Sequence, residues 1–204
     1  VYDKLDQAPR TLQLKIDLLD TAIKSFEKVG EVKTQAEEGR NTSVDAALQK
    51  AFAKKADTAK QLGDYETAIG AYAQMLELAR KRADEKATER GQHDASRFNV
   101  ASLSANLGLA KMAYRRDPAA ALEDFEGAMQ IIRELLSLPR SVGEGNGEVS
   151  SEDLAALGDE VRSMIGSLHY IQGDPAAAAP LFREALAARR LAAAASPSDR
   201  EAKR

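Results

Sequence analysis

The 204-residue sequence contains no cysteine, and only 5% of its residues are aromatic. The absence of cysteine excludes disulfides, zinc ribbons and thiol catalysis, and it permits a reducing compartment. No apolar run approaches the roughly 20 residues that a membrane helix needs. The opening residues, VYDKLDQAP, have neither the basic flank nor the apolar stretch of a signal peptide. We therefore expect a cytoplasmic chain, cut from a longer polypeptide, that makes no membrane contact.

The sequence also lacks an excess of positive charge. It has 29 Lys and Arg residues against 32 Asp and Glu residues, which gives a net charge of −3 and a pI near 5.6. Short basic clusters such as Arg80–Arg82 and Arg189-Arg190 lie among acidic residues or at expected helix ends, so a solvated helix face explains them best. Nucleic acid is accordingly not an expected partner.

What the sequence does contain is helix-forming residues. Hydrophobic residues make up 44% of the chain and charged residues 30%, enough apolar content for the core of a single domain spanning 1–204. Runs of β-branched residues are absent, and no segment alternates apolar and polar residues long enough to form a strand. The sequence predicts an all-α fold.

An internal repeat is the most informative pattern in the chain. An alanine is followed four residues later by an aromatic residue in four places: Ala22 and Phe26, Ala68 and Tyr72, Ala121 and Phe125, Ala178 and Phe182. Residues four apart share one face of a helix. A small residue there lets a neighbouring helix approach closely, and the ring one turn later fills the space beside it.

Three of the four copies begin with a similar turn. The turns read Gly63-Asp64-Tyr65, Arg116-Asp117-Pro118 and Gly173-Asp174-Pro175. Aspartate is a strong N-cap, proline fits the first helical position, and glycine allows the preceding helix to end in a left-handed conformation. Helices are expected before each turn, at roughly 44–62, 96–115 and 151–172. The pattern therefore predicts three units of helix, tight turn and second helix.

This arrangement resembles the tetratricopeptide repeat. The resemblance implies a right-handed superhelical solenoid of about seven antiparallel helices, made of three helix pairs and a leading helix at about 9–29. We expect the repeat units at about 44–92, 94–139 and 150–196, with a flexible loop at 139–150. The spacing departs from the ~34 residues of family repeats, because the four alanines stand 46, 53 and 57 residues apart. Long helices and insertions are expected to account for the difference.

The family pattern fits the third unit best. Gly166 matches the small residue of the first helix, and Ala178, Phe182 and Ala185 match the packing face of the second. In the first unit the matching residues are Phe52, Ala56, Ala59, Ala68, Tyr72 and Met75. In the second unit, Leu107-Gly108 stands one residue further from its turn than Gly166 does, which leaves the register of that first helix open.

A second resemblance concerns the parent protein. The leading segment YDKL…LLDTAIKSFEKV and the closing ALAARRLAAAASPSD look like regions that follow the catalytic domain of some bacterial Ser/Thr protein kinases. No kinase motif is present in the sequence. This resemblance implies that the chain is a sensor or docking region of a signalling protein.

No coherent catalytic set is visible. The glycine-rich stretch Gly143–Gly147 follows no strand and carries acidic residues, so we read it as a linker rather than a phosphate loop. Ser25 and Lys28 form an SxxK motif without the partner motifs of a β-lactamase-like site. His93 and His169 have no second histidine at metal-binding spacing. We expect no enzyme activity, no catalytic residue, no cofactor and no metal.

The resemblance places a partner-binding groove on the concave face, lined mainly by the first helix of each pair. Candidate lining residues are Lys50, Asp57, Lys60, Gln61, Asn106, Tyr114, Glu160, Ser163, Ser167 and Tyr170. An ordinary hydrated surface remains the alternative. The carboxylate clamp of chaperone co-factors is absent, because Ala53 and Asp57 stand where its Lys and Asn belong.

Three hypotheses of function follow. The first is a non-catalytic scaffold that binds a protein or peptide partner. The second is self-association through the alanine-rich last helix, whose Leu181, Leu186 and Leu191 point to more than one side and which needs a polar cap or a partner. The third, an all-α enzyme or small-ligand protein, has the least support.

Overall fold

The computed structural model describes residues 9–36, 42–85, 90–115, 117–138 and 149–195. Within these ranges the chain forms helices and turns and no strand. The elements are α2 (Pro9–Ala36), α3 (Thr42–Leu62), α4 (Tyr65–Glu85), α5 (Arg90–Ala110), the π-helical turn η1 (Lys111–Arg115), α6 (Pro118–Ser137), α7 (Ser151–Ile171) and α8 (Pro175–Ala195). The prediction of an all-α chain with three helix pairs and a leading helix is confirmed.

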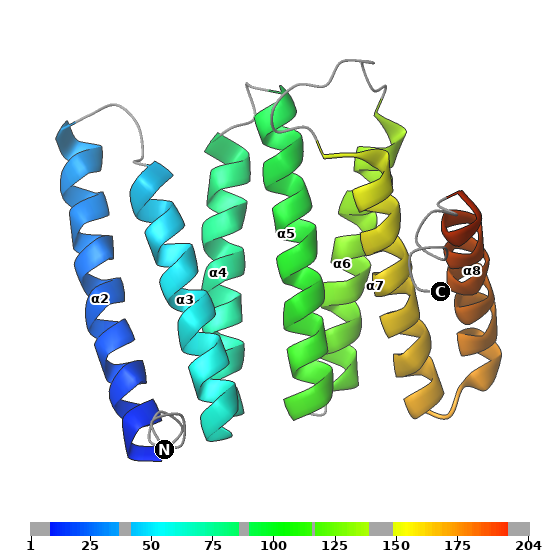
Figure 1. Ribbon diagram of the computed structural model, residues 1–204, viewed down its shortest axis with the longest axis horizontal. Coiled ribbons are helices and arrows are strands. Elements are labelled where there is room, and N and C mark those ends of the chain that lie inside the picture. Colours follow the sequence, from blue (N-terminus) through cyan, green and yellow to red (C-terminus); the bar gives the residue numbers. More distant parts are fainter. Residues whose placement is uncertain (1–8, 37–41, 86–89, 116, 139–148, 196–204) are drawn as a thin grey trace, which may run out of the picture.

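The helices stand side by side in a row, as Figure 1 shows. Each α-helix packs against the next one in the sequence, and α5 also touches α7. Helix α6 lies behind α5 and α7, while α2 and α8 form the two ends of the row (Figure 1). The described chain is therefore a helical-repeat solenoid in which α3–α4, α5–α6 and α7–α8 are the pairs.

Long helices contribute to the wide spacing of the repeats. Helices α3, α4, α5, α7 and α8 each have 21 residues and α6 has 20, which corresponds to about 30 Å of rise. The leading helix runs on through Gly30 to Ala36, past its expected end near residue 29, and Val44 of α3 lies beside Gly30. Helix α5 begins at Arg90, earlier than expected. Most of the expected loop at 139–150 lies outside the described residues.

The alanine positions of the repeat lie in the core. Ala68, Ala121 and Ala178 are fully buried, whereas Ala22 of the leading helix is half-buried. In the second and third pairs, the ring partner packs onto a glycine of the first helix. A Cβ on Gly108 would lie 2.8 Å from the Phe125 ring, and one on Gly166 would lie 3.1 Å from the Phe182 ring. The small-residue and ring pattern thus marks the contact between paired helices.

The turns follow the predicted capping chemistry. Gly63 and Gly173 have φ values of 80° and 83°, the left-handed conformation that glycine adopts without strain. The backbone N–H groups of Thr67, Ala120 and Ala177 donate to the Asp64, Asp117 and Asp174 carboxylates at 3.1, 3.1 and 2.9 Å. Helix α7 begins with a capping box between Ser150 and Asp153.

A π-helical turn settles the register that the sequence left open. In the outer repeats the N–H of the capping aspartate donates to a carbonyl five residues earlier: Asp64 to Ala59 and Asp174 to His169. In the middle repeat Asp117 donates to Lys111, six residues earlier. The extra residue is accommodated as the π turn η1. Gly108 therefore meets Phe125 just as Gly166 meets Phe182, despite lying one residue further from its turn.

Gly108→Ala tests this close approach. The added methyl would lie 2.8 Å from a Phe125 ring carbon and 3.0 Å from the Ala121 carbonyl oxygen. We expect the free energy of unfolding to fall by about 1–2 kcal/mol, because overpacking outweighs the gain in helix propensity.

Gly127→Ala is the matched control. Nothing lies within 4 Å of a Cβ at this α6 position, so the methyl should stabilise the helix by about 0.5–1 kcal/mol. Urea titration of both variants checks the pair. Equal effects at the two glycines would contradict the contact between Gly108 and Phe125.

Candidate partner-binding face

The predicted groove residues lie on the first helices of the three pairs, or on the π turn η1 that continues α5, and none of them is buried. Lys50, Asp57, Lys60 and Gln61 are on α3, Asn106 on α5, Tyr114 on η1, and Glu160, Ser163, Ser167 and Tyr170 on α7. We call the surface that these outward residues form the first-helix face. A ligand could reach it without the helices first separating.

Asp57 and Lys60 meet at the lower end of α3. The Lys60 ammonium lies 3.5 Å from Asp57 Oδ1 and donates to the Tyr72 hydroxyl oxygen of α4 at 3.4 Å. Partial burial has the largest single effect on the pKa of Lys60 and lowers it, and the hydrogen bond from Lys60 to the Tyr72 hydroxyl opposes this effect. Tyr72, Asp57 and Tyr114 also raise it electrostatically, so the pKa of Lys60 lies above 10.5. Lys60 is therefore a cation at neutral pH.

Tyr114 brings the second repeat to this junction. Its ring stacks on Tyr65, the first residue of α4, with ring centroids 4.2 Å apart and an interplanar angle of 3°. Such stacking contributes roughly 0.5–1.5 kcal/mol beyond the area buried. Tyr65 remains 41% exposed. We call Asp57, Lys60, Tyr65, Tyr72 and Tyr114 the tyrosine junction; it combines a charge pair with accessible aromatic surface.

The π turn positions Tyr114 in this junction. Lys111, the first residue of η1, lies 2.7 Å from Asp124 Oδ2 of α6. Both side chains are mostly buried, at 20% and 14% exposure, so the ion pair is little screened by solvent. The turn is thereby tied to α6 on one side and to Tyr65 of α4 on the other. Single π turns inside α-helices are frequent at functional sites.

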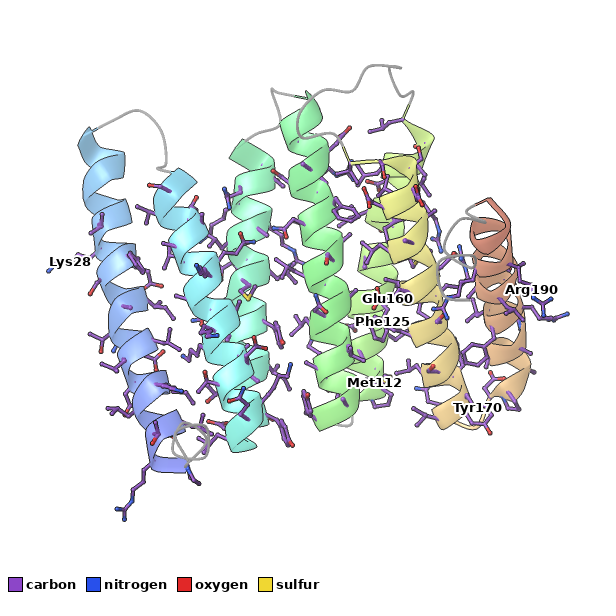
Figure 2. All side chains as sticks on the ribbon, in the orientation of Figure 1. Lys28, Met112, Phe125, Glu160, Tyr170 and Arg190 are labelled. Atoms are coloured by element: carbon purple, nitrogen blue, oxygen red, sulfur yellow. The ribbon has the colours of Figure 1, made fainter. Side chains whose placement is uncertain are left out.

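The α7 part of the first-helix face is less strongly polar than the sequence suggests. Ser163 and Ser167 donate their hydroxyl protons to the carbonyls of Asp159 and Ser163, one turn earlier on the same helix. These donors are thus already used within α7. Tyr170 is 67% exposed at the lower end of α7, where Figure 2 shows it. Tyr170 is the aromatic anchor that α7 offers.

The structure brings together only some of the predicted residues. Asp57, Lys60 and Tyr114 meet in the tyrosine junction, whereas the other predicted residues are distributed along their own helices. Sequence reasoning missed Tyr65 and treated Tyr72 only as a packing residue. One signal for Tyr65 was available, because it stands where the other two turns carry Pro118 and Pro175. Tyrosine at the first helical position lacks the fixed backbone conformation of proline, but it provides an aromatic ring for contact.

The described residues include no group of three His, Asp or Glu side chains that could hold a metal ion. His93 lies 3.9 Å from its neighbour Asp94 in the first turn of α5. His169 is half-buried in the last turn of α7, and its backbone carbonyl accepts the N–H of Asp174. Among the described helices, none is long and apolar enough to cross a membrane.

Comparison with known families agrees with this geometry. Residues 51–86 and residues 160–193 each match a family model described as Tetratricopeptide repeat. The two matches fall on α3–α4 and α7–α8, and the pair with the π turn lies between them. The chain therefore contains tetratricopeptide repeats, which generally mediate protein–protein interactions.

The search of curated proteins finds no match. Among solved structures, the chain is similar to the crystal structure of BtubC (BKLC) from P. vanneervenii, with 14% sequence identity and a TM-score of 0.37. That similarity covers 93% of this chain and 85% of the other.

Proposed function

We propose that the chain is a non-catalytic scaffold that binds a protein or peptide partner across its first-helix face. The observation that carries the proposal is the tyrosine junction. It is a preformed site between two repeats, with a cation, a carboxylate and a stacked aromatic pair that is still accessible. Peptide-binding surfaces commonly combine aromatic anchors with a few fixed polar groups.

The junction favours an extended segment of a partner. Lys60 can pair with an acidic group, while the open side of Tyr65 offers apolar surface to a neighbouring side chain. Tyr170, on α7, supplies a second aromatic contact two helix pairs away. A partner that contacts both positions binds more tightly than through either contact alone, because its translational entropy is lost only once.

The wider setting is part of the same proposal. We place the chain in the cytoplasm, as a regulatory or docking part of a larger bacterial signalling protein such as a Ser/Thr kinase. The support is the resemblance of the leading and closing segments to regions of bacterial Ser/Thr kinases, together with the absence of cysteine. Nucleic acid is disfavoured as a partner because the net charge is −3.

Tyr65→Pro tests the role of the junction. It should preserve the start of α4, because Pro118 and Pro175 occupy the equivalent positions of α6 and α8. It removes the stacked ring, so partner binding should weaken by roughly tenfold or more. Affinity capture from cell extract, followed by titration of the purified partner, measures the change.

Glu126→Ala, at an exposed position of α6, is the control. Glu126 takes no part in the tyrosine junction, so its substitution should leave the titration unchanged. The proposal fails if Tyr65→Pro and Glu126→Ala bind the captured partner equally well. It also fails if the purified chain turns over a substrate.

Self-association is the second candidate function. Both end helices expose large hydrophobic side chains. They are Leu14, Leu18 and Val29 on α2, and Phe182 and Leu186 on α8. Terminal repeats of a solenoid normally present a polar outer face. The sequence hypothesis placed self-association on α8, whose Leu181 is half-buried and whose Leu191 side chain lies outside the described residues.

A further inference from the structure

Helix α2 carries the pattern of a second helix, yet the described chain provides no first helix for it. Ala22 and Phe26 match the alanine and ring pairs of α4, α6 and α8. Each of those helices follows a first helix in its own pair. Helix α2 packs against α3, which is the first helix of the next pair. It is therefore placed as one half of a repeat.

Exposure at equivalent positions supports this reading. Seven residues after each repeat alanine stand Val29, Met75, Ala128 and Ala185. The last three are 8%, 0% and 4% exposed, whereas Val29 is 45% exposed. Ala22 is likewise more open than its three counterparts. The face that is buried within the complete pairs is open on α2.

The open face forms a continuous stripe along α2. Leu14 and Leu18 are 57% and 61% exposed, and Val29 continues the same side of the helix. Between them, the hydroxyls of Thr21 and Ser25 donate to the carbonyls of Asp17 and Thr21. Since these donors are satisfied within the helix, covering them leaves no donor unpaired. Burying this stripe therefore carries little desolvation penalty from polar groups. It consists of Leu14, Leu18, Ala22, Ser25 and Val29.

The stripe is complementary to the same stripe on a second copy when the two α2 helices run antiparallel. In an antiparallel pair of α2 helices, Leu14 lies opposite Val29 of the other copy, and Leu18 lies opposite its Ser25. The same register brings Asp17 of one copy within a turn of Lys24 and Lys28 of the other, on one edge of the stripe. Figure 2 shows Lys28 pointing away from the rest of the molecule. Opposite charges therefore meet twice, once on each side of the symmetry axis.

The other end of the row does not offer such a match. Leu186 of α8 has Arg183, Arg189 and Arg190 three or four residues away on the same side of the helix. Two copies of α8 brought together at Leu186 would juxtapose these arginines. Ala79 and Ile132 are buried where α8 carries the exposed Arg189. The charge at that position marks α8 as a polar cap.

We propose that the chain forms a two-fold dimer in which α2 pairs antiparallel with α2 of a second copy. In this dimer, α2 of the second copy lies where a first helix lies in the complete pairs, and it runs antiparallel to its partner as that first helix does. The axis lies between residues 21 and 22. This interface is separate from the first-helix face, so a failure of the dimer and a failure of partner binding are distinguishable.

Single cysteine variants test the register directly, because the natural chain has no cysteine. A disulfide requires Cα atoms about 4.4–6.8 Å apart. Under mild oxidation, a mixture of Leu18→Cys and Ser25→Cys chains should cross-link, as should Leu14→Cys mixed with Val29→Cys. Each variant alone should stay uncrosslinked. Efficient cross-linking of Leu14→Cys alone, or of Phe182→Cys alone, would overturn the proposal.

Sedimentation across micromolar to millimolar concentrations tests the dimer without cross-linking. The natural chain should pass from monomer to dimer, and Leu18→Glu should raise the dimer dissociation constant at least about tenfold by burying two unpaired carboxylates. Leu136→Glu makes the same change at an exposed leucine of α6 and should leave the constant unchanged. A natural chain that stays monomeric throughout, or equal effects of the two variants, contradicts the proposal.

Discussion

Phe125→Ala should lower the free energy of unfolding by about 3–5 kcal/mol. The Phe125 side chain is fully buried, and it lies in one core cluster with Ala101, Ala128 and Leu154. That cluster joins residues of α5, α6 and α7, so the ring contributes to contacts within one pair and between two pairs. Truncation loses the transfer free energy of the ring and leaves a cavity that rigid helices cannot close. Equilibrium unfolding in urea, followed by circular dichroism, measures the loss.

Phe182→Ala is the matched control. Phe182 occupies the equivalent position in the last repeat and also packs on a glycine, but it is 39% exposed because no helix of the described chain covers its outer side. We expect about half the loss or less, since a partly exposed ring has less transfer free energy to lose. If Phe182→Ala costs as much as Phe125→Ala, the burial gradient along the solenoid is wrong.

Ala121→Trp should destabilise the chain by about 3 kcal/mol. Ala121 is 0% exposed, and its carbonyl oxygen would lie 3.0 Å from a Cβ on Gly108. An indole cannot fit at so close a crossing unless α5 and α6 separate, which removes contacts on both sides of the new ring. Overpacking of well-packed cores typically costs ~1–3 kcal/mol, and this position has little room to adjust.

Ala119→Trp adds the same ring two residues earlier on α6, where the side chain is exposed. Its effect should stay within about 0.5 kcal/mol. Thermal melting of the two variants side by side checks the prediction. An unchanged melting temperature in Ala121→Trp would show that the alanine face of α6 is not a helix contact.

The packing faces could be predicted from the sequence because they rest on local spacing. A small residue and a ring four positions apart define one face of a helix wherever the helix lies. The turns were predictable for a similar reason, since the Asp64 and Asp174 caps depend on residues within one turn of them. These local rules gave the three pairs, the leading helix and the burial of Ala68, Ala121 and Ala178.

The tyrosine junction could not be predicted in the same way. Tyr114 reaches Tyr65 across 49 positions of sequence, and its direction depends on η1. A π turn inserts one residue and rotates everything before or after it by about 100°. Nothing in the sequence KMAYR itself distinguishes a π turn from an α turn. The insertion becomes visible only when Gly108 is compared with Gly166.

The exposure of one face of α2 could also not be predicted from local sequence patterns. Ala22 and Phe26 follow the repeat pattern as well as the other pairs do, so the sequence predicted similar burial for all four. Burial depends on whether a first helix is present, and that is a property of the arrangement of elements along the chain. Ala22 is more exposed than Ala68, Ala121 and Ala178 because no first helix in the described chain packs against it.

A double-mutant cycle between Gly108 and Phe125 tests most directly whether small residues and rings set the approach of paired helices. The measurement is the free energy of unfolding of Gly108→Ala, Phe125→Leu and the combination. Leucine removes the ring atoms that lie 2.8 and 2.9 Å from the added methyl. The methyl should then cost much less than it does in the natural chain, with a coupling of about 1 kcal/mol or more. Strict additivity of the two substitutions would contradict the account.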